Sequence, residues 1–173
     1  MRVALETERL ILRNVSPDDY LACYKWCGDP DVNRFLIYTL YDNAEEVKKW
    51  LASRNEDDPD SFDLGIVIKE TGELIGMGGI VYNPTADVWT LGYNLRKDMW
   101  GKGIVAEAMQ AIISYVRTIR QANIIEGQFC KDNRQSRRVM EKLGMSYYKD
   151  SQYVKADGSK VFEAETYRIV YGR

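Results

Sequence analysis

One stretch decides how the sequence is read: Leu91-Gly92-Tyr93-Asn94-Leu95-Arg96-Lys97-Asp98-Met99-Trp100-Gly101-Lys102-Gly103-Ile104-Val105-Ala106-Glu107-Ala108. It begins as an apolar strand, passes through a polar turn with two glycines, and opens a long amphipathic helical pattern. Glycines let an anion approach the backbone closely, and the first N–H groups of a helix have no partner within it. The stretch therefore predicts a phosphate-binding loop at a helix N-terminus.

The length and composition favour one globular domain over residues 1–173. Hydrophobic residues make up 45% and charged residues 29% of the chain, which excludes wholesale disorder. The net charge of −2 argues against a nucleic-acid-binding surface. Glu6, Glu8 and Arg9 interrupt any apolar leader, and the sequence has no apolar run long enough for a membrane span. We therefore expect a cytoplasmic protein with no nucleic acid and no membrane as partners.

Three cysteines and the absence of histidine limit the possible chemistry. Cys23, Cys27 and Cys130 are too few for a zinc site, which needs about four ligands. We expect free thiols in a reducing compartment and no metal. Acid–base chemistry must then use carboxylates, tyrosine, serine, cysteine or water.

The predicted element order is β-α-α-β-β-β-α-β-α-β-β, an α/β fold (α+β) with a mixed, mostly antiparallel central sheet and helices on both faces. The expected elements are a strand within 5–14, helices beginning at Ser16 and Asn43, strands at 62–68, 74–82 and 88–95, a helix at 103–121, a strand at 123–129, a helix at 133–143, and strands at 145–155 and 160–171. The strands at 88–95 and 123–129, which the helix at 103–121 connects, should be parallel to each other. Three glycines within 74–82 indicate a bulge or a close approach of another backbone.

The segment 31–41 between the first two helices is rich in aromatic residues, including Phe35, Tyr38 and Tyr41. Such side chains either pack a loop onto the core or form the wall of a substrate site. The sequence leaves both interpretations open.

Gly101-Lys102-Gly103-Ile104-Val105-Ala106 also fits the dinucleotide-binding pattern GxGxxA, and Glu126 follows about 20 residues later, as that pattern requires. The pattern should directly follow the first strand of a parallel sheet, however, and here a run of antiparallel strands precedes it. The sequence has no GxxxxGK[ST] motif for a nucleotide-binding P-loop. A dinucleotide-dependent oxidoreductase is therefore the weaker alternative.

A second stretch combines helix-capping and inward-facing polar residues: Asn133-Arg134-Gln135-Ser136-Arg137-Arg138-Val139-Met140-Glu141-Lys142-Leu143-Gly144-Met145. Ser136 lies four residues before Met140 and seven before Leu143, so helical periodicity places it on the inward, apolar face. A serine there can simply bond to its own helix backbone, and Asn133 can simply cap the helix.

The two stretches resemble the acetyl-CoA motifs of the GNAT N-acetyltransferases. The likeness is greatest to the RimJ/RimL branch, which acetylates N-terminal amines of ribosomal proteins, and it lies in Glu6-Thr7-Glu8-Arg9-Leu10-Ile11-Leu12-Arg13, Gly92-Tyr93, Trp100-Gly101-Lys102-Gly103 and the 133–144 helix. The resemblance covers essentially the whole chain and implies a GNAT-like acyl-CoA N-acyltransferase fold. It implies direct transfer of acetyl from acetyl-CoA to a primary amine of a protein N-terminus or a small molecule. The sequence does not determine the oligomeric state, and a homodimer is among the assemblies that we expect. A non-catalytic acyl-CoA-binding or sensor module is the alternative.

The resemblance also implies which residues bind acetyl-CoA. The loop and helix start would hold the pyrophosphate through the backbone of Trp100, Gly101, Lys102, Gly103, Ile104 and Val105. The strand residues Tyr93, Asn94 and Leu95 would splay from the 123–129 strand and pair with the pantetheine amides. Asn133 would bond the pantetheine arm. The family usually has Arg or Gln where this sequence has Asp98, and a proton-donating tyrosine where it has Met140.

The resemblance implies Ser136 as the acid for the leaving thiolate, in agreement with its inward face. The oxyanion would be stabilised by backbone N–H groups of the Tyr93–Leu95 strand. As the base we predict Glu163, which shares one strand face with Glu165 at a place where related enzymes often carry an acid. A solvent-facing stripe is the alternative for this pair, and Asp87 and Tyr93 are rival bases.

Overall fold

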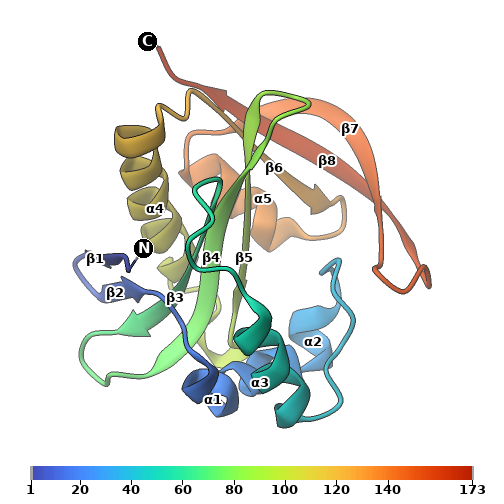
Figure 1. The fold of residues 1–173 in the computed structure, drawn as a ribbon. Coiled ribbons are helices and arrows are strands. Elements are labelled where there is room, and N and C mark those ends of the chain that lie inside the picture. Colours follow the sequence, from blue (N-terminus) through green and yellow to red (C-terminus); the bar gives the residue numbers. More distant parts are fainter. Residues whose placement is uncertain (1, 173) are drawn as a thin grey trace.

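A single sheet runs through the protein in a computed structural model that describes residues 2–172 (Figure 1). The strands are β1 (Ala4–Glu6), β2 (Leu10–Arg13), β3 (Ser61–Ile68), β4 (Leu74–Asn83), β5 (Val88–Leu95), β6 (Ile124–Cys130), β7 (Ser146–Val154) and β8 (Val161–Val170). The helices are α1 (Tyr20–Cys27), α2 (Pro30–Asn33), α3 (Ala44–Ser53), α4 (Ile104–Arg120) and α5 (Arg134–Lys142), with 3-10 turns η1 (Pro17–Asp19) and η2 (Lys97–Met99). The strand order is β1-β2-β3-β4-β5-β6-β8-β7, and β5 and β6 form the parallel pair in an otherwise antiparallel sheet. The predicted fold class is confirmed.

The first strand differs from its prediction, because a turn divides it into β1 and β2. Thr7 N donates to Leu10 O, and Leu10 N donates to Thr7 Oγ1, each at 3.0 Å. Glu107 of α4 fixes this turn by accepting from Thr7 Oγ1 at 2.6 Å and from Arg9 N at 2.9 Å. The structure also adds the single turn of α2, which begins at Pro30 and is capped by Asp29. Residues 2–172 therefore contain one strand and one helix more than predicted.

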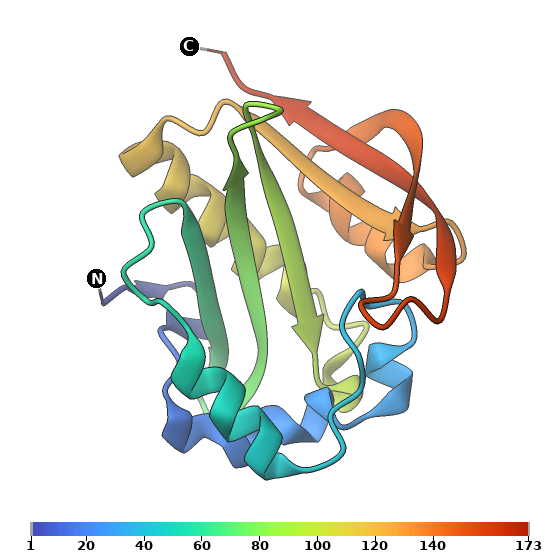
Figure 2. The ribbon, with the colours of Figure 1, turned by 45° about the vertical axis from the view of Figure 1, so that its right-hand side comes forward.

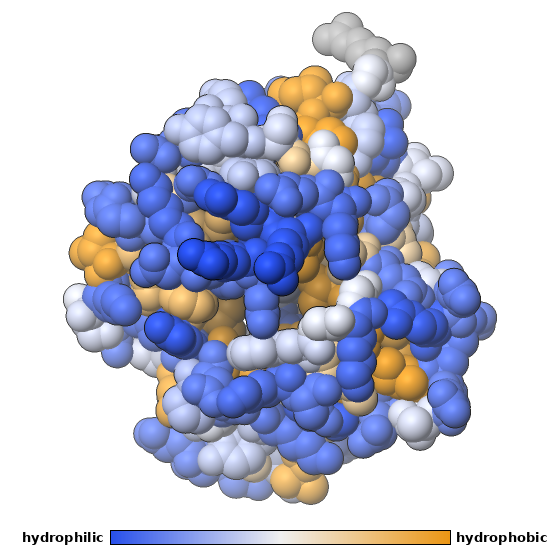
Figure 3. All heavy atoms as spheres, turned by 180° about the vertical axis from the view of Figure 1, so that it is seen from behind, coloured by the Kyte–Doolittle hydropathy of each residue, from blue (hydrophilic) through white to orange (hydrophobic). Residues whose placement is uncertain are grey.

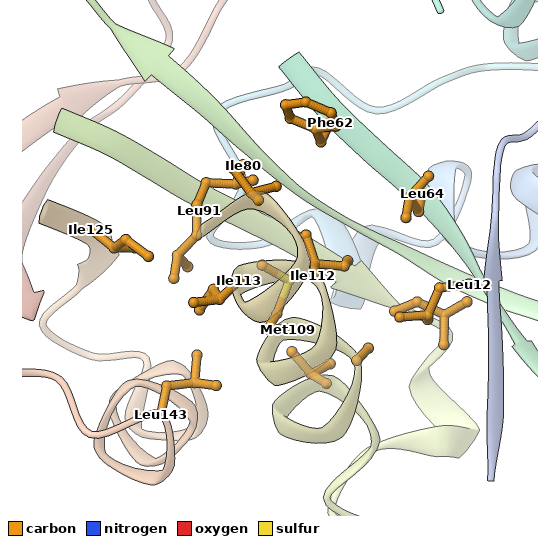
Figure 4. Packing of buried hydrophobic residues seen from close by; sticks show 14 of the residues in the cluster. Leu12, Phe62, Leu64, Ile80, Leu91, Met109, Ile112, Ile113, Ile125 and Leu143 are labelled. Atoms are coloured by element: carbon orange, nitrogen blue, oxygen red, sulfur yellow. The ribbon is translucent and has the colours of Figure 1, made fainter. Parts of the chain in front are cut away.

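Helices cover both faces of the sheet, as predicted, and each face has its own apolar core (Figures 1 and 2). Figure 4 shows the larger core, in which Met109, Ile112 and Ile113 of α4 pack toward β3, β4 and β5. The inward side chains of α4 are almost completely buried, and each contributes roughly 1.5–3 kcal/mol to folding. The second core joins α1 and α3 to the other face through residues such as Trp26 and Val47.

The glycines of β4 allow neighbouring elements to approach closely. A Cβ at Gly78 would lie 2.7 Å from Met109 Sδ, and one at Gly79 would lie 2.8 Å from Phe62 O. The close approach indicated by the sequence is therefore present, and α4 lies near the sheet because position 78 has no side chain.

The strands β5 and β6 separate halfway along their length, which is the feature that positions the site. Their pairing runs from Trp89↔Ile125 to Leu91↔Gly127 and ends there, although β5 continues to Leu95 and β6 to Cys130. Figure 2 shows the two strands diverging from this point. Met140 of α5 packs against Gly127, where a Cβ would lie 2.5 Å from its sulfur. The splay implied by the family resemblance is present.

The surface seen from behind in Figure 3 is mostly hydrophilic, with separate hydrophobic patches. Within residues 2–172, no helix combines the length and the hydropathy needed to span a bilayer.

Candidate active site

The predicted phosphate loop lies between β5 and α4 and contains two glycines with positive φ. Gly101 has φ +75° and Gly103 has φ +72°, in the left-handed region that favours glycine. Gly103 is the N-cap of α4, so the unpaired N–H groups and the positive end of the helix dipole lie at the loop. Trp100 fixes the loop to the strand, because its Nε1 donates to Leu95 O at 2.9 Å.

Two cations flank this helix N-terminus, and sequence reasoning missed both of them. Arg9 Nη1 donates to Lys102 O at 2.9 Å, and Arg9 Nε pairs with Glu107 Oε2 at 2.7 Å. A Cβ at Gly103 would lie 3.7 Å from Arg9 Nη2 and 3.9 Å from Lys142 Nζ. A guanidinium and an ammonium therefore stand where a bound phosphate would need them. The only sequence signal for Arg9 was its place in the motif from Glu6 to Arg13.

The negative charge of Asp98 is balanced by the neighbouring Arg96. Its carboxylate is held by the guanidinium of Arg96, with N–O distances of 2.6 and 3.0 Å. This hydrogen bonding keeps the pKa of Asp98 below its usual range. The acid in a position where the family usually has Arg or Gln is thus neutralised by its neighbour.

The side chains and the backbone of the predicted binding residues have separate roles. Ile104 and Val105 bury their side chains in the core, at 4% and 8% exposure, so that only their backbone can meet a ligand. Leu95 is buried as well, while Lys102 is exposed. Asn94 lines the cavity described next, and its Oδ1 accepts from Met77 N at 3.1 Å.

A cavity of about 550 Å³ lies beside the splay. Gly92, Tyr93 and Asn94 of β5 and Asn133 and Ser136 of α5 line one side of it. The structure therefore brings together residues that lie about 40 positions apart in the sequence.

The segment 31–41 forms the opposite wall of this cavity through Phe35, Tyr38 and Tyr41, among others. It is tied to the β7–β8 hairpin, because Lys155 Nζ donates to Leu36 O at 2.8 Å and Ala156 N donates to Ile37 O at 2.7 Å. Of the two interpretations left open by the sequence, the wall of a site is the one that this geometry favours.

Ser136 is held by two donors at the edge of the cavity. Its Oγ accepts from Tyr93 Oη at 2.9 Å and from Asn133 Nδ2 at 3.1 Å, and its N–H donates to Asn133 Oδ1 at 3.2 Å. A hydroxyl has two acceptor sites and one proton, so both acceptor sites of Ser136 are filled and its proton is left for another partner. Burial raises the pKa of Tyr93 to about 12, which keeps the phenol protonated as a donor.

The predicted base, Glu163, is not brought to Ser136. Its carboxylate accepts from Gln152 Nε2 of β7 at 2.6 Å, and the residue is exposed and outside the cavity lining. Glu165 pairs with Arg137 of α5 at 2.8 Å, outside the cavity as well. The rival Asp87 accepts from Tyr82 Oη at 2.8 Å in the β4–β5 turn. None of these three carboxylates lines the cavity.

Within residues 2–172, no group of three or more His, Cys, Asp and Glu residues is placed to hold a metal ion. The cysteines are free thiols. Burial raises the pKa of the Cys23 and Cys27 thiols to about 12, so they are poor nucleophiles.

Comparison with known proteins identifies relatives that match most of the chain. Residues 9–146 match the family described as acetyltransferase (GNAT) domain. The uncharacterized N-acetyltransferase p20 of Bacillus licheniformis is 30% identical over 165 residues, which cover 89% of each protein. A GNAT-family acetyltransferase from Bacillus anthracis has a TM-score of 0.84 at 20% identity, over 97% of this chain and 98% of that one. RimL, a ribosomal L7/L12 α-N-protein acetyltransferase solved with coenzyme A, has a TM-score of 0.81 at 15% identity, over 98% of both chains.

Proposed function

We propose how this site works from the premise that the chain belongs to the GNAT family of acetyltransferases. The chain is an N-acetyltransferase that uses acetyl-CoA as its co-substrate. Acetyl-CoA supplies an acetyl group activated as a thioester, which the nitrogen of a primary amine can attack. What remains to be derived is the role of each residue and the class of acceptor.

The residues present fit acetyl-CoA. The backbone of Gly101 and Gly103, the N-terminus of α4, and the side chains of Arg9 and Lys142 would hold the pyrophosphate. β5 loses its partner β6 beyond Leu91, so its edge can pair with the amides of an extended arm, like an added strand. A Cβ at Gly92 would have no atom within 4 Å, so this part of β5 is open to a ligand.

The hydrogen bonding of Ser136 is the observation that carries the proposal. With Tyr93 and Asn133 filling its acceptor sites, Ser136 Oγ is oriented to donate its proton to a departing thiolate. Backbone N–H groups of Tyr93–Leu95 would stabilise the oxyanion. Met140 has no proton to give, and its side chain packs against Gly127 instead.

The acceptor would enter the cavity on the side formed by segment 31–41 and the β7–β8 hairpin. A protein N-terminus is the acceptor that we favour, and a small amine is the second candidate. The fold likeness to RimL, a protein acetyltransferase that acts on an α-amine, supports the first. We also propose a homodimer, which sedimentation equilibrium would test.

The test is release of free CoA thiol over a panel of acceptors: peptides with a free α-amine, the same peptides with a blocked N-terminus and a lysine, and small amines. We expect release that requires both acetyl-CoA and an amine. Tight binding of acetyl-CoA without turnover on any amine would instead indicate a binding module. Melting curves add an independent arm, since a ligand at 100 times its Kd adds about 2.7 kcal/mol. A shift with NAD and none with acetyl-CoA would refute the proposed function.

A further inference from the structure

A row of three residues crosses the sheet beside the splay. Asp63 of β3 pairs with Gly79 of β4, and Gly79 pairs with Gly92 of β5. Because Gly79 and Gly92 have no side chains, no side chain from these two positions lies between the carboxylate and the open part of β5. A Cβ at Gly79 would lie 2.9 Å from Asp63 Oδ1, so the carboxylate lies directly over this bare backbone.

Asp63 faces the cavity and not the main core. Its neighbours Phe62 and Leu64 are buried in the α4 core, so strand alternation puts Asp63 on the other face. It lines the same cavity as Gly79, Gly92 and Ser136. With β3 and β5 two strand spacings apart, its backbone is about 10 Å from Gly92, and the side chain shortens that gap.

We propose that Asp63 binds the ammonium of the acceptor in this cavity and takes its proton before acetyl transfer. The inference rests on the proposed function and supplies the base that the sequence placed at Glu163. It also names the substrate class, a protonated α-amine. The side chain of the residue that carries this amine would lie against the aromatic wall of segment 31–41.

The charges around Asp63 favour a cation. Arg54 Nη2 lies 3.3 Å from Asp63 Oδ2 and 3.4 Å from Glu56 Oε1, so one guanidinium is shared by two carboxylates. The phenol of Tyr38 also faces Asp63 across the cavity. These groups together carry one negative charge more than positive, which the ammonium of the acceptor would balance.

Asp63 has the acidity that the step needs. Burial raises its pKa to about 6. The positive charge of Arg54 lowers this pKa, and the negative charge of Glu56 raises it, but burial has the largest effect. The side chain remains 35% exposed, because it lines the cavity and also borders a second hollow of about 460 Å³ beside the 54–61 loop. That hollow offers the proton a path to solvent after the reaction.

The proton and electron balance is simple. One N–H bond of the ammonium breaks and its proton moves to Asp63 Oδ. The electron pair left on nitrogen forms the bond to the acetyl carbon, and the π pair of the carbonyl moves to its oxygen. When that pair returns, the C–S bond breaks, its electrons leave on sulfur, and the sulfur takes the proton of Ser136 Oγ. The nitrogen, now positively charged, passes a second N–H proton to Ser136 Oγ, so the products are a neutral amide and a thiol. Asp63 then loses its proton to water. An α-amine has a pKa of about 8 and a lysine side chain about 10.4, so this transfer favours the α-amine by roughly 10²-fold.

The experiment is kinetics of Asp63→Asn in the full chain, on a peptide with a free α-amine. We expect kcat/KM for the peptide to fall about 10²-fold, with the calorimetric Kd of acetyl-CoA unchanged. The wild-type profile of kcat/KM should have an acidic limb near pH 6, and the variant should lack it. Glu70→Gln, which removes an exposed carboxylate in the β3–β4 turn, is the matched control and should behave as wild type.

A second variant guards against misfolding, because Asp63→Asn removes the nearer of the two carboxylates beside Arg54. Asp63→Glu keeps the charge and should retain the acidic limb with a smaller loss of kcat. A folded Asp63→Asn protein with wild-type kinetics overturns the inference, as does a wild-type profile without the limb, or a preference for lysine over the α-amine. In the first two cases the proposed function stands, and in the third the acetyl transfer stands while the protein N-terminus is lost as the favoured acceptor. Failure of the wild type to release thiol with any amine overturns the proposed function itself.

Discussion

Replacing Ser136 by alanine is the sharpest test of the proposed acid, because it removes one oxygen and little else. That oxygen accepts hydrogen bonds from Tyr93 Oη at 2.9 Å and from Asn133 Nδ2 at 3.1 Å. The cap bond from Ser136 N to Asn133 Oδ1 involves only the backbone of Ser136 and is retained. The phosphate loop at Gly103 is untouched.

The expected size of the effect follows from these contacts. An unsatisfied buried donor costs about 1–3 kcal/mol, and Ser136→Ala removes the acceptor of both Tyr93 Oη and Asn133 Nδ2. We therefore expect Ser136→Ala to lower the free energy of unfolding by about 1–2 kcal/mol, or Tm by roughly 2–8 °C. Loss of a general acid should lower kcat about 10²-fold, equivalent to about 2.7 kcal/mol. The Kd of acetyl-CoA should not change.

The assay is thiol release at saturating acetyl-CoA, with Tyr93→Phe as the companion variant. Tyr93→Phe keeps the ring and removes one donor, so it should lower kcat by about tenfold or less. Because the phenol acts through Ser136, the double variant should be no slower than Ser136→Ala alone. A folded Ser136→Ala protein with kcat within about twofold of wild type would refute the acid role.

Three further predictions concern the phosphate loop and its supports. Gly103→Val should abolish acetyl-CoA binding in calorimetry, because the new side chain enters the space beside Arg9. Gly101→Ala is the control: this position has a similar positive φ but open space around it, so the variant should still bind acetyl-CoA. Loss of binding in both variants would point to backbone strain instead. Arg9→Met should weaken acetyl-CoA binding and reduce its salt dependence, and equal salt slopes in variant and wild type would count against the pairing with phosphate. Burial opposes the charge of Glu107, but hydrogen bonds from Thr7 and Arg9 outweigh it and lower its pKa, so its stabilisation is complete above pH 4.5 and is lost as the pH falls through the lowered value. Glu107→Gln should thus show a smaller fall of Tm between pH 7 and about pH 3 than wild type, and equal falls would contradict the assignment.

The elements that could be predicted from sequence are those with local causes. The 3.6-residue period of α4 predicted a buried stripe of Ile104, Ala108, Ile112, Val116 and Ile119, and its members are buried except Ile119 in the last turn, which is 41% exposed. Asn43 caps α3, with its Oδ1 accepting from Glu46 N. The division of the first strand could not be predicted, because Glu107, 100 residues away from Thr7, fixes that turn.

The site divides in the same way. The loop at Gly103 and the inward face of Ser136 follow from short motifs and helical periodicity. Arg9 reaches the site through the turn that Glu107 fixes, and Asp63 reaches it through strand pairing, and the sequence specifies neither contact residue by residue. For Glu163, alternation predicted correctly that it shares a face with Glu165, but not that this face lies away from the cavity.

The central claim is that acetyl-CoA lies along the open edge of β5 with its phosphates at the N-terminus of α4. A titration of the ¹⁵N-labelled protein with acetyl-CoA, followed by amide NMR, tests it most directly. The account predicts that the largest shifts fall on Gly92–Leu95 and on Gly103, Ile104 and Val105, with no comparable response of the β5 amides to NAD. Shifts confined to other parts of the chain, or β5 amides that respond equally to NAD, would contradict it.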